Sequence, residues 1–349
     1  KYSSLENLPQ GIKIQNLSKV WTNEKNDEKV QSIIKQNKYA KIKTFTALNT
    51  AFLHEGIFIS VEPNAKINKP IHILSISIGK EIISQPRIIV HVGKNAKVEI
   101  LENYCSLTED VHFTNAVSEI FVEEKAFLEY VKIQQQAHTQ YHIHDVSIHQ
   151  QKESEAAFFS LALGSAIARN DIEIFLEGEN CKSNLNGLYI SAGEQLLDHH
   201  TAIHHLQPNC ESHELLKGIL HEKSRAVFNG KIFVEPIAQK TNSKQTNRNL
   251  LLSDDATINT KPQLEIFADD VKCTHGTTVG GLDSQSIFYL ESRGISKETA
   301  TGMLTVGFAS EVTEKIMNEQ FRKKIDTLIV EHLKQKIKNE TLPEIVHAE

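Results

Sequence analysis

KNAKVEI at residues 94–100, EKAFLEY at 124–130 and SEAAFFS at 154–160 share one pattern, in which a short polar turn leads to alanine and then to a strand-like apolar segment. The three alanines, Ala96, Ala126 and Ala156, are evenly spaced along the chain. Alternating apolar residues are typical of β-strands, and a fixed period of about 20–50 residues is typical of solenoids. These stretches predict a mainly β protein of stacked coils, with small residues at tight corners.

The same pattern extends in both directions along the chain. Most successive small residues keep nearly the same spacing, one interval is only about half as long, and strand-like segments lie between them, as at 87–92, 98–101 and 231–234. No long helical stretch interrupts residues 57–279, which disfavours βαβ folds, because those need a helix between parallel strands. Chance spacing of alanine after polar turns is the alternative explanation. The full series is Ala65, Ala96, Ala126, Ala156, Cys181, Cys210, Ala226 and Ala256.

The two ends of the chain follow other patterns. We therefore expect a partly helical N-terminal region at 1–56, a β-solenoid core at 57–290 and a C-terminal helical region at 291–349. Residues 1–38 are polar, with one helical candidate around Asp27–Gln36. The chain begins with Lys1 rather than Met, which leaves open a preceding N-terminal segment.

Three helices are predicted in the C-terminal region. Ser296 is a suitable N-cap for a helix over Ala300–Phe308, a second helix carries Val312 and Ile316, and a third runs from about Glu319 to Lys338. The third has an apolar stripe, which either covers the β-core, because a solenoid must protect its open ends, or docks a partner. The stripe consists of Phe321, Ile325, Leu328, Ile329, Leu333 and Ile337.

Composition and charge exclude several classes of function. A net charge of −6 argues against nucleic-acid binding and against polybasic contact with a membrane, since both need clustered positive charge. The most apolar run, 158–168, is about half as long as a membrane helix. The four cysteines lack metal-type spacing, and no secretory leader is evident, so we expect reduced thiols and a cytoplasmic location. They are Cys105, Cys181, Cys210 and Cys273.

Cys273 and His275 are the strongest candidates for site residues. They stand two apart after Leu264–Val271 (LEIFADDV), which reads as extended, and residues two apart on a strand share a face. Thiols and imidazoles suit borderline metals and iron–sulfur clusters. Two ligands do not complete a tetrahedral site, however. Either the pair is structural, or another chain supplies the missing ligands.

The other histidine-rich segments support a rival hypothesis, a stand-alone metal-dependent enzyme on a β-solenoid. In HTQYHIH, His138, His142 and His144 share a face of a predicted strand, and His199–His205 (HHTAIHH) follows Asp198, which could orient a ring. The alternative is that these histidines are solvent-facing or hydrogen-bonded on outer strand faces. HExxH, GxGxxG, GxSxG and the phosphate-loop motif are all absent.

Taken together, the motifs around ADDVKCTHG resemble the SufB/SufD family of iron–sulfur cluster assembly proteins, with a SufD-like pattern. The segment NLLLSDDAT lacks the cysteine that SufB-like chains carry after the corresponding Asn. The resemblance is dense over residues 198–308 and thinner before them. The matching residues are Phe45–Ala51, Gly56, Asp198, Thr201, His204, Pro208, Ser212, Lys217, Gly218, Ser224, Arg225, Phe228, Gly230, Ala238, Gln239, Thr241, Asn249–Ser253, Lys261, Pro262, Leu264, Glu265, Asp269–His275, Phe288–Leu290 and Arg293–Ile295.

The resemblance implies a right-handed parallel β-helix between helical regions, and a scaffold subunit rather than an enzyme. It implies a SufB-like partner, and a SufC-like ATPase that supplies the ATPase activity and docks on the C-terminal helices. By the same resemblance, His275, accompanied by Cys273, contributes to a transient iron–sulfur cluster shared with SufB, and the isolated chain holds no tightly bound cofactor. Without the SufB-like partner, two copies of the chain can pair as a homodimer through the surface that would otherwise bind that partner.

Overall fold

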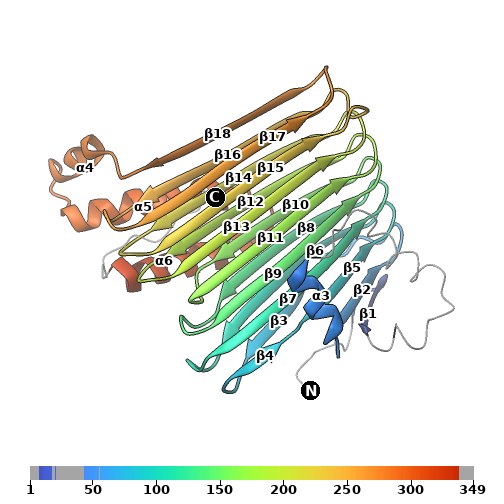
Figure 1. The fold of residues 1–349 in the computed structure, drawn as a ribbon, viewed down its shortest axis with the longest axis horizontal. Helices are drawn as coiled ribbons and strands as arrows, with labels where there is room; N and C mark the ends of the chain where they lie inside the picture. The colour runs from blue at the N-terminus through green and yellow to red at the C-terminus, as the bar shows by residue number, and fades with distance from the viewer. Residues whose placement is uncertain (1–7, 18–19, 21–42, 55, 338–349) are drawn as a thin grey trace.

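Two sheets of mostly parallel strands form the body of the protein in the computed structural model, which describes residues 8–17, 20, 43–54 and 56–337 (Figure 1). Sheet A contains β1 (Ile12–Asn16), β2 (Ile57–Val61), β4 (Ile82–Ser84), β5 (Arg87–Val92), β7 (His112–Val122), β9 (Tyr141–Gln150), β11 (Ile167–Leu176), β13 (Leu196–His205), β15 (Arg225–Val234) and β17 (Thr257–Ile266). Sheet B contains β3 (Ile71–Ser77), β6 (Lys97–Ser106), β8 (Phe127–Gln135), β10 (Glu155–Ala162), β12 (Lys182–Ser191), β14 (Glu211–Leu220), β16 (Asn242–Leu251) and β18 (Lys272–Gly280).

The chain alternates between the two sheets, so that each coil adds one strand to each of them. Tyr141 pairs with Ile167 and Ile167 with Leu196, so successive coils are similar in length but not equal. Apolar side chains from both sheets fill the space between them, for example Ile148, Leu185 and Phe228. The predicted parallel β-solenoid is therefore confirmed, and the repeat in the sequence is not chance spacing.

The corner that leads into sheet B has the same construction in every coil except the last. A residue with positive φ, such as Asn95 at 57° or Asn180 at 59°, turns the chain, and the next residue points inward and is small. Asn tolerates the left-handed region better than most residues, which explains the polar turn in the repeat. The buried corner residues are Ala96, Ala126, Ser154, Cys181, Cys210 and Thr241.

Three members of the predicted series do not lie at this position: Ala156, Ala226 and Ala256, of which Ala256 lies at the opposite corner, just before β17. The register places Ser154 and Ser224 at corners, so that Ala156 and Ala226 lie two residues further along, inside strands. The corner at Ser224 is the opposite one, where the chain enters sheet A. The short interval between Cys210 and Ala226 therefore spans about half a coil, because a small residue is useful at either corner.

Of the N-terminal elements, β1 extends the edge of sheet A and helix α3 covers part of its outer face. Strand β1 pairs antiparallel with β2, and helix α3 (Thr44–Ala51) packs on β7 and β9. Asn49 of α3 is fully buried and donates to the carbonyl oxygen of Asn115 at 2.8 Å. Its side-chain oxygen lies 3.3 Å from Arg87, which pairs with Glu119 at 2.7 Å. The segment FTALNTA is thus an anchoring helix.

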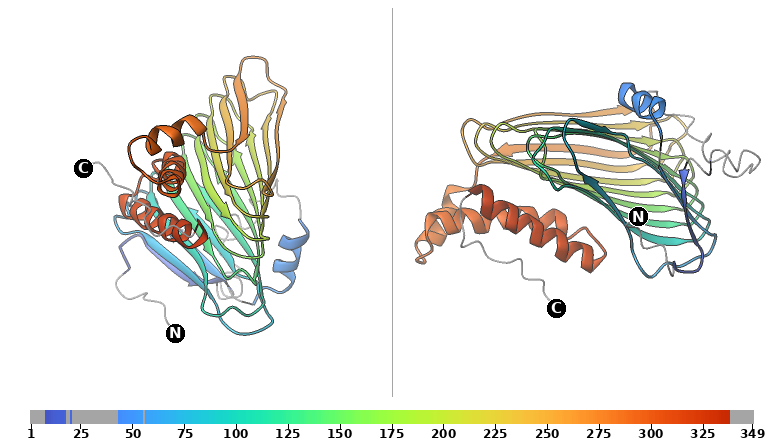
Figure 2. Two further views of the ribbon diagram at one scale, coloured as in Figure 1. Left: turned by 90° about the vertical axis from the view of Figure 1, so that its left-hand side faces the viewer. Right: turned by 90° about the horizontal axis from the view of Figure 1, so that it is seen from below.

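The C-terminal helices α5 (Lys297–Thr313) and α6 (Glu319–Ile337) lie on the outer face of sheet B, opposite α3 (Figure 2). Buried Phe321, Ile325 and Ile329 of α6 pack in one cluster with Val131 and Leu161 of the sheet. The predicted stripe therefore covers the side of the solenoid and neither caps its end nor remains free for a partner. The side chain of Ile337, Pro343 and the candidate helix at Asp27–Gln36 lie outside the residues whose side chains the structure describes.

Helix boundaries differ from the prediction at two places. Ser296 caps α5 as expected, accepting from the backbone nitrogen of Thr299 at 3.2 Å. A single helix, however, contains both Ala300–Phe308 and Val312, because no breaker separates them. Helix α4 (Ser284–Glu291) was not predicted. Its N-cap, Asp283, was the available signal, since its carboxylate accepts from the backbone nitrogen of Ser286 at 2.9 Å.

One buried lysine fixes the helices to sheet B. The side chain of Lys217 on β14 is fully buried. Its Nζ donates to the carbonyl oxygen of Phe308 at 2.7 Å and pairs with Glu311 at 2.5 Å. Arg248 on β16 reaches the same carboxylate at 2.8 Å. No helix within the described ranges is long and apolar enough to cross a lipid bilayer.

Candidate functional site

The last coil of the solenoid, formed by β17 and β18, is the candidate site. Each is the terminal strand of its sheet, so that within the described residues no strand pairs with its outer edge (Figure 1). The predicted extended run Leu264–Val271 is not one strand. It leaves β17 at Ile266 and turns before β18 begins at Lys272, because the coil must change sheets there.

Cys273 and His275 both lie on β18 and share its inward face, as the two-residue spacing predicted. Cys273 is the register neighbour of Ser243, and His275 that of Gln245, two residues buried between the sheets. Because β18 is terminal, this inward face is open on one side. His275 is exposed and Cys273 half-buried, against Ile266 and Val271. Burial raises the pKa of the Cys273 thiol.

The inner faces of the last three strands of sheet B carry two polar rows that lead to this pair. In the first row, His205 Nε2 lies 2.8 Å from the Ser212 hydroxyl, which lies 2.7 Å from that of Ser243, beside Cys273. In the second, Thr201 donates to Glu214 at 2.7 Å. Gln245 donates to the same carboxylate at 2.8 Å, beside His275. We name the second row, Glu214–Gln245–His275, the inner polar row. Glu214 and Gln245 carry no signal in the sequence that marks them as site residues, because only the strand register brings them beside His275.

The segment His199–His205 divides between two environments. His199 and His205 point inward and are buried, and burial lowers the pKa of each to about 3. His200 and His204 lie on the outer face. The Asp198 carboxylate lies 2.9 Å from His200 Nε2, and Arg169 joins the same carboxylate at 2.5 Å, so a carboxylate does stand beside a ring of this segment. That Asp198 orients the ring for a metal ion stays a prediction.

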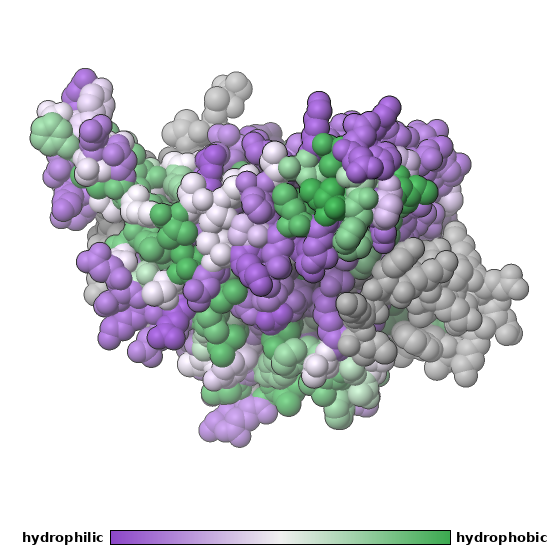
Figure 3. All heavy atoms as spheres, turned by 45° about the horizontal axis from the view of Figure 1, so that its top comes forward, coloured by the Kyte–Doolittle hydropathy of each residue, from purple (hydrophilic) through white to green (hydrophobic). Residues whose placement is uncertain are grey.

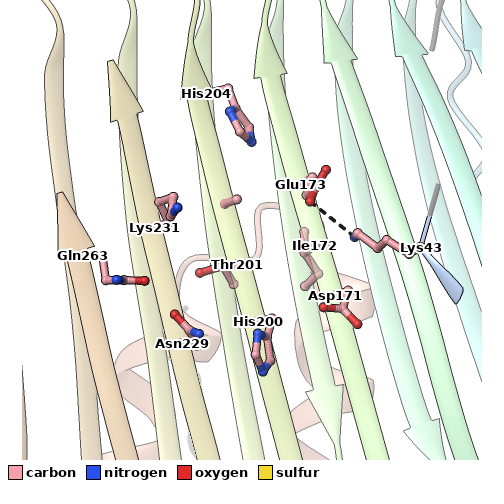
Figure 4. A pocket seen from close by; sticks show the side chains of 11 residues that line it. Lys43, Asp171, Ile172, Glu173, His200, Thr201, His204, Asn229, Lys231 and Gln263 are labelled. Carbon is pink, nitrogen blue, oxygen red and sulfur yellow. Dashed lines mark ion pairs between the residues drawn. The ribbon is translucent and has the colours of Figure 1, made fainter. Parts of the chain in front are cut away.

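A shallow hollow of about 310 Å³ lies on this outer face beside α3 (Figure 4). Its charged groups are already paired. Lys43 lies 3.4 Å from Glu173, Lys231 lies 2.7 Å from Glu265 and Arg169 holds Asp171 at 2.8 Å. Within the described residues, no group of three or more His, Cys, Asp or Glu side chains is arranged to hold a metal ion. The hollow therefore does not support the rival metal enzyme.

The histidines of HTQYHIH do not lie on outer strand faces either. Strand β9 begins at Tyr141, so His138 belongs to the preceding turn. His142 and His144 are fully buried and contact the Tyr104 ring at centroid distances of 4.8 and 5.5 Å. Burial lowers the pKa of both rings. The predicted outer-face position is wrong because the strand register turns the rings of His142 and His144 inward, and His138 does not share their strand.

The remaining cysteines have structural environments. Cys181 and Cys210 are the buried corner residues of successive coils, and the two thiols donate to the same carbonyl oxygen, that of Gly178, at 3.1 and 3.2 Å. Cys105 is half-buried on β6, and burial raises the pKa of its thiol. All four cysteines are free. Only Cys273 combines partial exposure with a neighbouring imidazole.

These features define a parallel β-solenoid whose open last coil presents one thiol and one imidazole, those of Cys273 and His275, on the inward face of its terminal strand. The family model for the SUF system FeS cluster assembly SufBD core domain matches residues 75–308, and that for the SufBD protein N-terminal region matches residues 1–73. The chain belongs to the SufBD family of the SUF system, whose members take part in iron–sulfur cluster assembly.

Several relatives carry the name SufD. The chain is 34% identical to the iron–sulfur cluster assembly protein SufD of Escherichia coli over 287 residues, which are 81% of this chain and 68% of that protein. A SufBD family protein of Synechocystis is 36% identical over 284 residues, which cover 78% of this chain and 63% of the relative. SufD of Bacillus subtilis is 26% identical over 294 residues, covering 83% and 67%. The chain thus spans about two thirds of the length of these relatives.

Proposed function

We propose that this chain is a SufD-like, non-ATPase subunit of an iron–sulfur cluster assembly scaffold, and that its last coil shares a transient cluster with a SufB-like partner. The observation that carries the proposal is the placement of His275 and Cys273 on the terminal strand β18, where a second chain can reach them. A cluster iron takes about four ligands, mainly thiolates, with histidine as an occasional substitute. The two side chains present here supply only part of such a set.

The free edges of β17 and β18 support the position of the partner. A terminal strand presents unpaired backbone donors and acceptors, which favour pairing with a strand of another chain. A SufB-like solenoid that continues both sheets would place its own ligands beside His275. A site divided between two chains forms and empties as they move, as a scaffold that passes on its cluster requires. In the absence of this partner, a second copy can pair on the same edges.

The test of the cluster site is a His275→Ala variant. We expect it to retain its fold, because His275 is exposed, and to lower the cluster yield of the reconstituted complex about tenfold. Absorption spectra recorded after anaerobic reconstitution with both partners measure the yield. His213→Ala, which removes an exposed histidine from the outer face of β14, is the matched control. A normal yield from the His275→Ala complex would show that the histidine is not a ligand.

Helix α4 is the best candidate for docking the SufC-like ATPase. It follows β18 directly and projects from the body as the lobe at the upper left of Figures 1 and 3. None of its residues is buried, and Phe288 and Tyr289 are 71% and 56% exposed. Exposed neighbouring aromatics are frequent anchors of protein interfaces. Since the α6 stripe packs on sheet B, we move the proposed docking site from the predicted region 291–349 to α4, which ends where that region begins.

A Phe288→Ala/Tyr289→Ala double variant tests this docking site. We expect its affinity for the ATPase partner to fall about 10- to 100-fold, because two aromatic anchors are lost, while thermal unfolding stays unchanged. Calorimetric titration measures the affinity, and Met317→Ala, an exposed apolar residue between α5 and α6, is the control. Deletion of residues 296–349 is a poorer test, because it would uncover the apolar face of sheet B. Unchanged affinity in the double variant would place docking elsewhere.

The proposal places the protein in the cytoplasm. It is supported by the four free cysteines, since reducing compartments keep thiols unpaired. The stand-alone metal enzyme remains the second candidate only if metal copurifies with the isolated chain and chelation removes an activity. Absence of metal from the isolated chain, with cluster assembly only in the presence of partners, is the result that we expect.

A further inference from the structure

We propose that Gln245 and Glu214 position the imidazole ring of His275. The Gln245 side-chain oxygen accepts a hydrogen bond from one ring nitrogen of His275 and thereby directs the other ring nitrogen toward the open end of the solenoid. The inference deepens the proposed function, because it concerns the same candidate ligand. Gln245 and Glu214 are positioning residues, since neither would touch the cluster.

The first support is the placement of the three side chains in one row. Glu214, Gln245 and His275 are successive register neighbours on β14, β16 and β18. Parallel strands lie about 4.8 Å apart, and register neighbours project from the same face. Glu214 and Gln245 are buried between the sheets at 2% and 1% exposure. His275 therefore continues the row on its open side, within reach of the Gln245 carboxamide.

The second support is the hydrogen bonding of that carboxamide. Gln245 Nε2 donates to one oxygen of Glu214 at 2.8 Å, and Thr201 donates to the other at 2.7 Å. An ionised carboxylate only accepts, so the amide nitrogen must face Glu214 and the amide oxygen must face away. The Gln245 oxygen is buried, and within the described residues it has no hydrogen-bond partner. Buried acceptors without partners are rare, and the nearest side chain along the row on that side is His275.

The third support is steric. Gly230 on β15 faces the Gln245 side chain across the interior, and a Cβ atom added to Gly230 would lie 2.4 Å from Gln245 Nε2 and 2.5 Å from the Phe228 ring. Glycine leaves the space that this carboxamide occupies, so the amide is confined to one place. A confined amide with a fixed orientation can select one tautomer of a neighbouring imidazole, as the partners of metal-binding histidines do.

The tautomer of His275 provides a direct test on the isolated chain. We would record long-range proton–nitrogen spectra of the chain labelled with ¹⁵N-histidine at about pH 8.5. Burial raises the pKa of Glu214 to about 7, so its carboxylate is ionised at that pH. The signals absent from a His275→Ala sample identify the ring. We expect one tautomer to hold about nine tenths of the wild-type population, and Gln245→Leu to give the mixture of a free imidazole.

Two further variants make the result specific. Glu214→Gln removes the constraint on the amide and is expected to weaken the tautomer preference while Gln245 is still present. Ser243→Ala changes a buried residue in the neighbouring row and is expected to leave the preference intact. Thermal unfolding identifies any variant that fails to fold. A free-imidazole mixture in the wild type, or an unchanged tautomer in folded Gln245→Leu, would overturn the inference.

The outcome is separable from that of the proposed function, because the tautomer is read without cluster or partner. A fixed tautomer, together with a normal cluster yield from His275→Ala, would support the positioning of His275 by the inner polar row. It would also show that His275 is not a cluster ligand. If His275 is both positioned by Gln245 and a cluster ligand, Gln245→Leu should lower the cluster yield about tenfold, while the affinity for the SufB-like partner stays unchanged.

Discussion

A Val279→Pro variant is expected to keep its fold and to lose binding to the SufB-like partner that we propose. Strand β18 bonds to β16 through alternate residues, beginning with the Lys272 nitrogen, which donates to the Thr241 carbonyl oxygen. Alternate residues of a strand direct their backbone groups to opposite sides, so the nitrogens of Cys273, His275, Thr277 and Val279 face the free edge. Proline at an outward-facing position of an edge strand is tolerated by the strand itself, but it removes a donor that a partner strand needs.

Val279 is the suitable position because it stands four residues beyond His275 and leaves the candidate ligands unchanged. We expect the affinity for the partner to fall about 100-fold, equivalent to about 3 kcal/mol, from the lost donor and the clash of the ring with an adjacent strand. Light scattering and calorimetric titration measure association. Val279→Ala, which retains the nitrogen–hydrogen group, should bind as the wild type does. If the proline variant is folded and binds normally, the partner does not extend sheet B.

The second large effect is expected at the buried ion pair that holds the first coils together. Arg87 and Glu119 lie on neighbouring strands β5 and β7, with side chains only 9% and 11% exposed. Arg87 Nε and Nη2 donate to one Glu119 oxygen at 3.0 and 2.7 Å, and Arg87 also reaches Asn49 of α3. Replacing one partner leaves the other charge buried without compensation, which typically costs about 3–5 kcal/mol.

We therefore expect Arg87→Met to lower the free energy of unfolding by about 3–5 kcal/mol, measured by denaturant titration. The double variant Arg87→Met/Glu119→Leu should recover most of the loss, because two apolar side chains of similar volume replace the pair. Lys94→Met, which breaks an exposed pair with Glu124, is the control and should change stability by less than about 1 kcal/mol. Equal, small effects of the two single variants would show that burial of the pair contributes little.

Much of the fold could be predicted because its signals are local. The polar turn with Asn in a left-handed conformation, the small corner residue and the alternating strand recur in the sequence itself, as do the Ser296 cap and the stripe on α6. It was also predictable that the side chains of Cys273 and His275 share a face, since residues two apart on any strand project from the same side. Helix α4 was missed because its only strong signal is a single capping aspartate.

The inner rows could not be predicted in the same way. Glu155 pairs with Lys182, Lys182 with Glu211 and Glu211 with Asn242, so each of these coils is slightly longer than the one before it. With coils of unequal length, no fixed period identifies which side chains become neighbours. For the same reason the sequence placed Ala156 and Ala226 at corners and His142 and His144 outside.

The order of the residues was enough to establish that the chain coils into strands with small corners, that helices follow the strands and that one thiol and one imidazole share a face. Only the folded coils establish that the shared face opens at the free end of the stack, that Glu214 and Gln245 stand behind His275, and that the α6 stripe is buried against sheet B. The sequence is sufficient for turns and for alternating strands because both depend on residues that are neighbours along the chain. Register and burial, in contrast, depend on residues a whole coil away, which meet only when the coils stack.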